Sequence, residues 1–387
     1  MPITASPEPR RRSDHEIVLA LNSGSSSVKF GLYDVGRLSL TVVAAGEVEG
    51  ADTGKAVFDH ISEVLADAKA PSPTAIGHRV VHGGPQLRRH CRIDADVIRQ
   101  LEAAIAFAPL HGPASLALVR GAADRYPDLP QVACFDTAFH ATLPEVAYTL
   151  PISRELRAEG LRRYGFHGLS CESIVCQVEN NIPDRLIIAH LGNGASVTAV
   201  KAGRSIDTSM GLTPSGGIIM GSRSGDLDPG VLVYLLRKKG FDAKAAEALV
   251  DHQSGLLGIS GLSSDMRRLH EASASTPDAA LAVAMFCISV RKQIAAMIAV
   301  LDGIDVLVFT GGIGENDALV RSAICAGLGW AGIMIDAGPN GGGTGSRVKI
   351  LPSREDEQVA RHAREIIQAN CSPHSCFPRP GRLPIAG

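Results

Sequence analysis

The sequence lacks an excess of charge of either sign, a targeting segment and the common phosphate-binding loops. Its 38 Lys and Arg residues nearly balance 40 Asp and Glu residues, so the formal net charge at pH 7 is −2. A chain with so small a net charge has no general attraction for nucleic acid or for an anionic lipid surface. We therefore expect small-molecule partners, with no nucleic acid and no membrane.

The N-terminal segment gives no sign of export or membrane insertion. We expect no apolar run near the roughly 18 residues that a transmembrane helix requires. The start, MPITASPEPRRRSDHE, also lacks the apolar core of a signal peptide. The sequence thus predicts a soluble cytoplasmic protein with a disordered tail over residues 1–16.

The eight cysteines show no disulfide or zinc pattern. Most stand in apolar contexts such as VACFD and MFCIS, where a reduced thiol behaves as a small apolar side chain. Two pairs with C-x4-C spacing, Cys171/Cys176 and Cys371/Cys376, differ from common zinc sites and have no second ligand pair beside them. We expect neither disulfides nor structural zinc.

The familiar phosphate loops are missing, although several Gly-rich turns are present. GADTGKA only approaches G-x-x-x-x-G-K-[ST], and no predicted strand precedes a complete G-x-G-x-x-G. A nucleotide would therefore need other turns. The candidates are NSGSSS at 22–27, HLGNG at 190–194, GSRSGDLDPG at 221–230 and TGGIGEN at 310–316.

The HLGNG turn allows two interpretations. Asn-Gly is typical of a two-residue hairpin whose central residues both take positive φ. Backbone N–H groups without flanking side chains also form a nest that a phosphate can approach closely. TGGIGEN likewise is either a tight corner or a helix N-terminus on which a nucleotide lies. Four such turns in one chain favour the anion site.

The length of 387 residues and a 45% hydrophobic content predict two domains. Alternating strand and helix patterns predict an α/β fold with a ligand cleft between two lobes. IVLALNSGSSSVKFGLYDV and LIIAHLGNGASVTAVKAGRSIDTS share a plan of strand, small-residue turn and strand, which indicates a duplicated core.

The Pro-punctuated passage ATLPEVAYTLP is the predicted boundary between an N-terminal lobe over 17–150 and a C-terminal lobe over 151–352. A helix at about 353–368 and a Pro-rich tail over 370–387 follow. Further helices are predicted at 55–69, 95–107, 113–125, 228–252, 277–302 and 316–329.

Cationic residues of several motifs are candidates for anion recognition. Lys29 follows the first turn on an alternating strand and points into the cleft or lies exposed on the strand. Arg79 in GHRVVHGG suits bidentate binding of a carboxylate or phosphate, or is a surface arginine. Asp136 in FDTAFH and His167 in RRYGFHG either take part in the chemistry of the site or only cap turns. With Arg223 in GSRSGD they match the charge-neutralising set of phosphoryl transfer.

These motifs together resemble the acetate kinase family. In chain order they are LNSGSSSVKF, GHRVVHGG, FDTAFH, YGFHG, AHLGNGASV, DTSMGLTP, RSGDLDPG and TGGIGEN, from about Ile17 to Arg361. The resemblance implies a homodimeric two-lobed enzyme with the sugar kinase/Hsp70/actin-like fold. It also implies reversible transfer of the γ-phosphoryl group of ATP to acetate, giving acetyl phosphate and ADP, with Mg²⁺ or Mn²⁺. The C-terminal lobe would bind nucleotide and dimerise, and the helix at 353–368 would return to the first lobe.

The resemblance also implies roles for individual residues. Asn22 and Glu355 would hold the metal, and Arg79 would bind the substrate carboxylate. The apolar pocket for the acyl group would consist of Val81, Leu110 and Pro214. The catalytic set would be Asp136, His167 and Arg223. The residues that would bind nucleotide are Lys29, His190, Leu191, Gly192, Asn193, Gly194, Asp265, Met266, Arg267, Gly312, Ile313, Gly314, Glu315 and Asn316.

The chemistry of the substrate limits the task of Asp136. A carboxylic acid with a pKa of roughly 4 to 5 is already ionised at pH 7. We therefore expect Asp136 to place Mg²⁺ and its waters rather than to remove a proton. The cations Arg79, Arg223 and His167 would offset the repulsion between the anionic nucleophile and the phosphate.

Departures from the family pattern concern substrate choice. Leu169 and Cys171 stand where Thr and His are common, and Ser215 and Gly216 stand where Leu-Glu is common. A smaller loop after Pro214 would admit propionate or butyrate, because one methylene is worth only about 1 to 3 kcal/mol. The alternative from another class is an actin-like or Hsp70-like ATPase without an acyl substrate.

Overall fold

A computed structural model describes most of the chain. Residues 1–16 and 370–387, predicted as tails, lie wholly or largely outside the described part, as do Leu110 and most of the glycine loop after α13. The described ranges are 15–24, 27–50, 54–108, 111–334 and 347–369.

The first sheet has six strands in the order β3-β2-β1-β4-β6-β5. β1 to β3 form an antiparallel meander, and β1, β4 and β6 run parallel. Consecutive buried residues from Val18 to Leu21 reflect a strand that is covered on both faces. The strands are β1 (Glu16–Ser23), β2 (Ser27–Val35), β3 (Leu40–Glu49), β4 (Ala75–Val80), β5 (Cys91–Arg92) and β6 (Gln131–Phe135).

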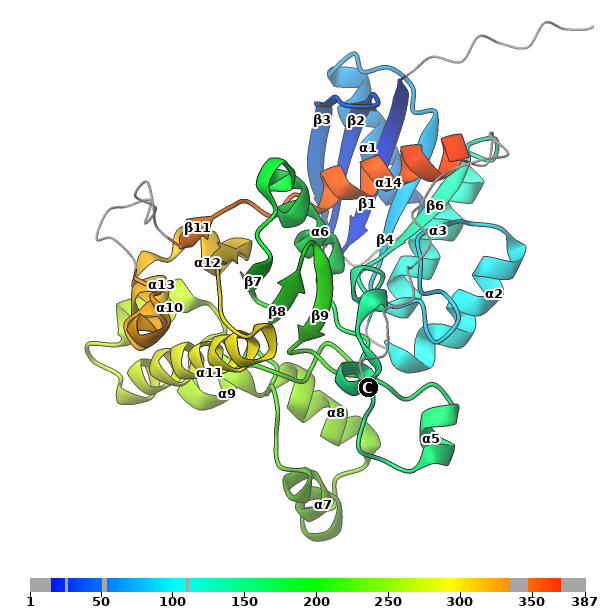
Figure 1. Ribbon diagram of the computed structural model, residues 1–387. Helices are drawn as coiled ribbons and strands as arrows, with labels where there is room; N and C mark the ends of the chain where they lie inside the picture. Colours follow the sequence, from blue (N-terminus) through cyan, green and yellow to red (C-terminus); the bar gives the residue numbers. More distant parts are fainter. Residues whose placement is uncertain (1–14, 25–26, 51–53, 109–110, 335–346, 370–387) are drawn as a thin grey trace, which may run out of the picture.

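Helices from opposite ends of the chain cover this sheet (Figure 1). One face packs Phe58, Ile61 and Leu118 against Leu19 and neighbouring residues. The other face receives the last helix, which contacts β1, β4 and β6. The helices are α1 (Lys55–Asp67), α2 (Ala95–Ala104), α3 (Gly112–Arg125) and α14 (Glu355–Ala369).

The second sheet repeats the plan of the first. Its order is β11-β10-β7-β8-β9, in which β11, β10 and β7 run parallel and β7 to β9 form an antiparallel meander, as in β6-β4-β1-β2-β3. The strands are β7 (Arg185–Leu191), β8 (Ala195–Lys201), β9 (Arg204–Thr208), β10 (Val306–Thr310) and β11 (Val348–Ile350). The predicted duplicated α/β core is therefore correct.

The long helix α11 (Pro277–Leu301) carries the core of the second half. Phe286, Val290 and Ile294 pack towards β7 and β8, and the helix contacts both strands. By length and composition α11 is apolar enough to cross a membrane, so the expectation that no such stretch exists was wrong. Its apolar residues serve a core, because a helix that packs on a sheet needs a wide apolar face.

Several predicted helices have different bounds. The segment 228–252 forms two helices, because Gly240 takes a φ of 69° and the Asp242 side chain caps a new helix at Ala245 N–H. The segment 310–329 begins a helix earlier than predicted, at Gly311, and Asp317 caps a second. These helices are α7 (Pro229–Lys238), α8 (Ala243–His252), α12 (Gly311–Asn316) and α13 (Ala318–Cys325).

Short helices connect these layers. α6 packs against α14 and β7, between the two sheets. The remaining helices are α4 (Glu145–Tyr148), α5 (Arg154–Ala158), α6 (Gly168–Gln177), α9 (Gly255–Ser260), α10 (Met266–Ala272), η1 (Ile105–Phe107), η2 (Phe139–Thr142), η3 (Glu179–Asn181) and η4 (Gly329–Ala331).

Candidate active site

The end of β1 brings three predicted site residues into one row. Asn22 is in register with Lys29 on β2 and with Arg79 on β4. Side chains at paired positions of neighbouring strands point to the same face. Lys29 is exposed and lines a cavity together with Asn22 and Arg79. Lys29 was predicted either to lie exposed on its strand or to point into the cleft. It does both, because its exposed side chain forms part of the cavity wall.

Arg79 and Asp136 form a buried ion pair at this row. Arg79 Nη2 donates to Asp136 Oδ2 at 2.6 Å, and Nε donates to both carboxylate oxygens at 3.0 and 3.1 Å. Burial opposes the charge on the guanidinium, but the adjacent carboxylates of Asp136 and Glu355 raise the pKa of Arg79. Burial raises the pKa of Asp136, and Arg79 acts against that shift. Asp136 thus contacts Arg79 directly from the end of β6.

The first turn of α14 adds carboxylates to the same row. Arg79 Nη1 donates to Asn22 Oδ1 at 2.9 Å and lies 3.5 Å from Glu355 Oε2. Asn22 Nδ2 donates to Asp356 Oδ1 at 3.0 Å. Burial opposes the ionisation of Glu355, but Arg79 and other cations lower its pKa. Amide and carboxylate oxygens therefore gather beside a fixed cation.

The second sheet has a corresponding row at the end of β7. His190 is in register with Thr310 on β10 and Ser196 on β8. Its ring stacks on His167 with centroids 4.1 Å apart, and His167 Nδ1 lies 3.0 Å from Ser196 Oγ. Ser170 Oγ lies 2.8 Å from His190 Nδ1. The two rings are thereby fixed against each other.

The surroundings of His167 oppose the positive charge that the sequence predicted for it. Burial lowers its pKa well below the usual value, and the charges of His190, Arg79 and Arg223 lower it further. In the neutral tautomer that accepts from Ser196 Oγ at Nδ1, the ring carries its N–H at Nε2. In this tautomer His167 can donate a hydrogen bond to an anion without a net charge.

The Gly-Asn-Gly turn brings the second half of the chain close to these groups. None of Gly192, Asn193 and Gly194 takes a positive φ, so the two-residue turn with two positive φ angles is wrong. A Cβ on Gly194 would lie 3.2 Å from His167 Nε2 and 3.3 Å from Arg223 Nη1. Glycine at 194 thus leaves space where His167 and Arg223 meet.

Arg223 reaches this point from the loop before α7. Its Nη2 lies 3.3 Å from His111 Nε2, and Nη1 donates to the Pro214 carbonyl at 3.4 Å. Burial lowers the pKa of Arg223, Asp251 raises it, and Arg79 lowers it. Arg223 and Arg79 are thus close enough to interact electrostatically, as the sequence predicted.

Two adjoining cavities contain most of the predicted ligand-binding residues. One of about 580 Å³ lies between the lobes, and its walls include Asn22, Lys29, Arg79, His190, Gly312, Glu315 and Glu355. The other, of about 830 Å³, includes Gly192, Asn193, Asp265, Met266, Arg267, Gly312, Ile313 and Asn316. Gly312 belongs to both walls, so the two cavities adjoin at the start of α12.

Other predicted nucleotide-binding residues have structural contacts. Leu191 is fully buried in the core, and Gly314 is buried on α12 against β7 and β10. Glu315 Oε1 accepts from Gly311 N–H at 3.0 Å and from Ser353 N–H at 2.9 Å. Glu315 therefore caps its own short helix and ties it to the segment before α14.

The predicted acyl pocket is described in part. Val81 is buried in the core of the second half together with Phe166 and Ile218. Pro214 is half-buried, and its carbonyl accepts from Arg223. Leu110 lies outside the described residues.

The departures in α6 are core positions. Leu169 and Cys171 are fully buried between α6 and the sheets and are absent from the walls of both cavities. Ser215 Oγ donates to the Asp251 carboxylate, so this departure acts on the loop that carries Arg223. Of the departures, those at Ser215 and Gly216 thus lie on the loop beside Arg223, and those in α6 do not line the cavities.

Sequence reasoning missed several residues that hold the site together. His111 contacts Arg223, Ser196 orients His167, and Asp356 orients Asn22. His111 could have been found, because it directly follows the predicted acyl-pocket segment. Ser196 lies in the motif AHLGNGASV and Asp356 directly follows Glu355, but only the register of β7 and β8 and the position of α14 reveal their contacts.

Comparison with known proteins decides the family. The family model described as the Acetokinase family matches residues 42–361. The chain belongs to the acetokinase family. Acetate kinase of Brachyspira hyodysenteriae is 41% identical over 385 residues, covering 89% of this chain and 97% of that relative. Acetate kinase of Rhodopseudomonas palustris is 39% identical over 393 residues, covering 90% and 97%.

Solved structures of acetokinase relatives share the fold. A propionate kinase from Francisella tularensis superposes with a TM-score of 0.84 at 36% identity, covering 91% of this chain and all of the other. Acetate kinase of Porphyromonas gingivalis superposes with a TM-score of 0.80 at 35% identity and the same coverage. The two-lobed α/β fold is therefore confirmed, and the chain is a kinase that acts on a carboxylate.

Proposed function

We propose that this acetokinase reversibly transfers the γ-phosphoryl group of ATP to acetate, giving acetyl phosphate and ADP. The observation that carries the proposal is the approach of Arg79 and Arg223 from different halves of the chain to the neutral donor His167. Fixed donors and cations aimed at one point stabilise charge that develops in a transition state. A site that joins two anionic reactants needs this arrangement.

The charge distribution fits phosphoryl transfer to an ionised acid. Acetate, with a pKa of roughly 4 to 5, is an anion at pH 7, and the phosphate that it attacks is also an anion. Arg79 and Arg223 offset this repulsion, while His167 donates from Nε2. Asp136 keeps the Arg79 guanidinium in a fixed orientation, which lowers the cost of organising the site when ligands bind.

The oxygen-rich end of β1 fits a divalent metal. Amide and carboxylate oxygens of Asn22, Glu355 and Asp356 lie together at the first turn of α14, next to the Arg79–Asp136 pair. Hard oxygen donors are the ligands of Mg²⁺ and Mn²⁺. Asn22 and Glu355 would hold the metal, with Asp136 aiding its placement. When bound, the ion would neutralise charge on the β- and γ-phosphates.

The two adjoining cavities fit ATP. Its nucleoside would occupy the larger cavity beside Asp265, Met266 and Ile313. Its phosphates would pass Gly312 and reach Lys29 and His190 in the smaller cavity. The glycines of the two turns let the phosphates approach the backbone N–H groups closely.

Propionate is the second candidate substrate, supported by the structural likeness to a propionate kinase. Ser215 and Gly216 lie on the loop that holds Pro214 beside Arg223, so a longer acyl group would extend towards this loop. An apolar pocket discriminates one methylene by only about 10- to 200-fold. The two acids therefore need a direct comparison.

The decisive assay traps acyl phosphate with hydroxylamine. Purified enzyme, ATP and Mg²⁺ are incubated with acetate, propionate, butyrate or glycerol, and hydroxamate and ADP are both measured. Acetate should give the highest kcat/KM, with propionate next and glycerol giving no product. ADP release without hydroxamate from any acid would favour an ATPase and contradict the proposal.

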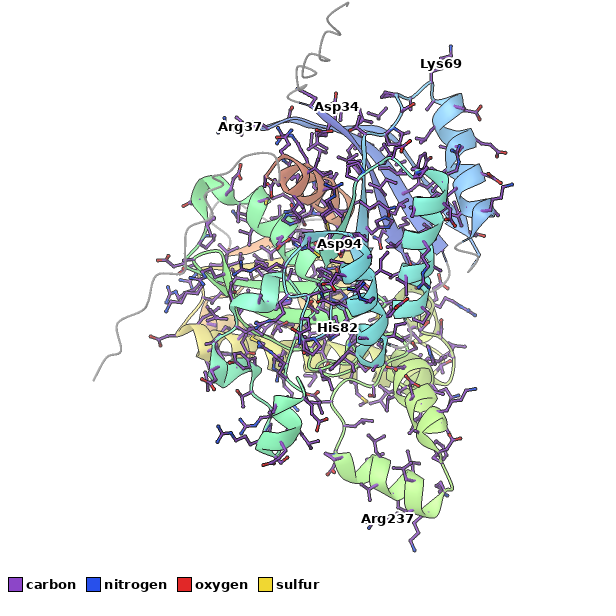
Figure 2. All side chains as sticks on the ribbon, turned by 90° about the vertical axis from the view of Figure 1, so that its right-hand side faces the viewer. Asp34, Arg37, Lys69, His82, Asp94 and Arg237 are labelled. Carbon is purple, nitrogen blue, oxygen red and sulfur yellow. The ribbon has the colours of Figure 1, made fainter. Side chains whose placement is uncertain are left out.

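We further propose that the enzyme is a cytoplasmic homodimer that pairs through the second half. Exposed apolar side chains occur on each of two helices, on α7 with Val231 and Tyr234 and on α11 with Leu281, Met285 and Ile288. Arg237 on α7 lies at the end of the molecule opposite Lys69 (Figure 2). Such apolar area typically marks an interface.

Light scattering should give twice the chain mass for the wild-type enzyme. The double variant Leu281→Glu, Met285→Glu should give the mass of a monomer. A monomeric wild-type enzyme would contradict the proposed homodimer.

A further inference from the structure

A second group of titratable side chains lies behind the active site. His90 in the loop before β5, Glu172 on α6 and His362 on α14 form what we call the buried triad. His362 Nε2 lies 2.7 Å from Glu172 Oε2, and His90 Nε2 lies 3.5 Å from the same oxygen. The two imidazole rings lie 4.0 Å apart, centroid to centroid. The proposed function uses none of these residues.

The composition of the buried triad matches a zinc site, but its hydrogen bonds do not. The backbone N–H of Phe135 donates to His90 Nδ1 at 3.0 Å. A neutral imidazole that accepts at one nitrogen carries its proton on the other. His90 therefore presents an N–H to Glu172, where a metal would need a lone pair. His362 lies between Glu172 and Glu365, whose carboxylates raise its pKa and favour its protonated form.

Each member of the buried triad is linked to a segment that carries a proposed active-site residue. Phe135, the partner of His90, directly precedes Asp136 at the end of β6. Glu172 lies on the first turns of α6, whose N-cap is His167. His362 lies two turns into α14, which begins at Glu355. Three segments distant in the sequence are thus joined at one buried point.

We propose that the buried triad is a positioning device that fixes these three segments relative to one another during catalysis. The inference rests on the proposed function, because it concerns the same site. Helices transmit small displacements along their axes, so a shift at the buried triad moves the helix N-termini that face the ligands. A misplacement of 1 Å at reacting groups can lower the rate by on the order of 10²-fold.

The test compares Glu172→Gln with Glu172→Asp in the full-length enzyme. Substrate is whichever carboxylate of the panel is turned over fastest, and kcat is measured per folded enzyme well below the unfolding midpoint. Glu172→Gln should lower kcat by on the order of 10-fold, with KM for both substrates within about 2-fold of wild type. Glu172→Asp, which keeps the charge, should recover part of kcat.

Leu65→Ala is the matched control for lost stability. Leu65 is buried between α1 and the outer face of the first sheet, away from both cavities. This variant should unfold at a lower temperature with kcat unchanged. If Glu172→Gln does not fold, His90→Gln replaces it, since this change leaves the Glu172–His362 ion pair intact, and it should lower kcat by about 3- to 10-fold.

The possible outcomes separate the two proposals. If the wild-type enzyme forms hydroxamate with another acid but not with acetate, the proposed substrate is wrong. The Glu172 variants can then be assayed with that other acid, so the positioning role of the buried triad is still tested. Wild-type kcat in Glu172→Gln, or in His90→Gln as its replacement, overturns the positioning role. Equimolar zinc in enzyme purified without chelator would also overturn it, because the group would then be a metal site.

Discussion

The two sheets share a topology but contribute different chemistry to the cleft. In the first sheet the row at the end of β1 places Lys29 and Arg79 on either side of Asn22. In the second sheet the corresponding row places the uncharged Ser196 and Thr310 on either side of His190. Duplication of the fold thus preserves the position of a site while its side chains diverge.

Burial requires each of the two rows either to pair its charges or to avoid them. The buried cation of the first row has carboxylate partners in Asp136 and Glu355. In the second row burial lowers the pKa of His190 and His167, which favours the neutral form of both rings. The cation that the second half contributes, Arg223, comes from a loop instead. One sheet therefore provides paired charge, and the other provides neutral donors and space for the ligand.

The largest effect should follow from removing the charge of the first row. Arg79→Gln leaves Asp136 buried without its cation, so kcat should fall by on the order of 10³-fold. The free energy of unfolding should also fall by about 3 to 5 kcal/mol, as when one partner of a buried ion pair is lost. Steady-state kinetics and urea unfolding measure the two effects. Loss of activity without loss of stability would contradict the paired-charge description.

The loop cation of the second half should matter nearly as much for rate and much less for stability. Arg223→Ala should lower kcat by on the order of 10²- to 10³-fold. Its unfolding midpoint should stay close to wild type, because Arg223 hydrogen-bonds a carbonyl and a histidine. Wild-type turnover in this variant would show that the Arg223 cation is not needed to offset the charge of the reactants.

The space in the second half can be tested by filling it. In Gly194→Ala the new methyl group would contact His167 Nε2 and Arg223 Nη1 at 3.2 to 3.3 Å. These groups must move, so kcat should fall by on the order of 10-fold. Gly329→Ala is the control, since a Cβ there meets nothing within 4 Å. Equal kcat in the two variants would show that Gly194 is not needed for close approach.

The last prediction concerns pH and the buried triad, and affects stability rather than kcat. Burial lowers the pKa of His362, but Glu172 and Glu365 outweigh it and raise the pKa to about 9, from 6.5. His90 and Cys134, the neighbouring titratable groups, stay neutral because burial opposes their charge. Because the folded protein binds the His362 proton more tightly than the unfolded chain does, protonation of His362 stabilises the fold. This contribution is fully present below pH 6.5 and is lost as pH rises through about 9.

The raised pKa of His362 corresponds to about 3 kcal/mol of unfolding free energy lost between pH 6.5 and 9. Glu172→Gln should flatten this part of the pH profile, and Asp305→Asn, which breaks the Arg185–Asp305 pair near the surface, should not. Urea unfolding at four pH values in this range measures the slope. An unchanged slope in Glu172→Gln would contradict this assignment.

The sequence predicted the architecture well where apolar patterns were continuous. The two meanders, the core strands and α11 follow from alternating or buried apolar runs. The break between α7 and α8 was missed because residues on both sides continue a helical pattern, while Gly240 and Asp242 decide locally. Weak signals such as the two-residue β5 give no period to detect.

The motifs named candidate site residues, but not the contacts that support them. Arg79, His167 and Arg223 stand in recognisable motifs, and the structure places them near one another. The lowered pKa of His167 was not predicted, because burial and neighbouring charges are three-dimensional properties. His362 and Glu172 are 190 residues apart, and no single sequence relates such positions.

The position of α14 affects synthesis of the chain as well as catalysis. Val359, Ala360 and Ala363 complete the core on one face of β1 and β6, yet they are synthesised long after these strands. Until α14 has been made, the nascent first sheet lacks the helix that covers this apolar face. A chain truncated before α14 should therefore aggregate, and it would also lack Glu355 in the cleft.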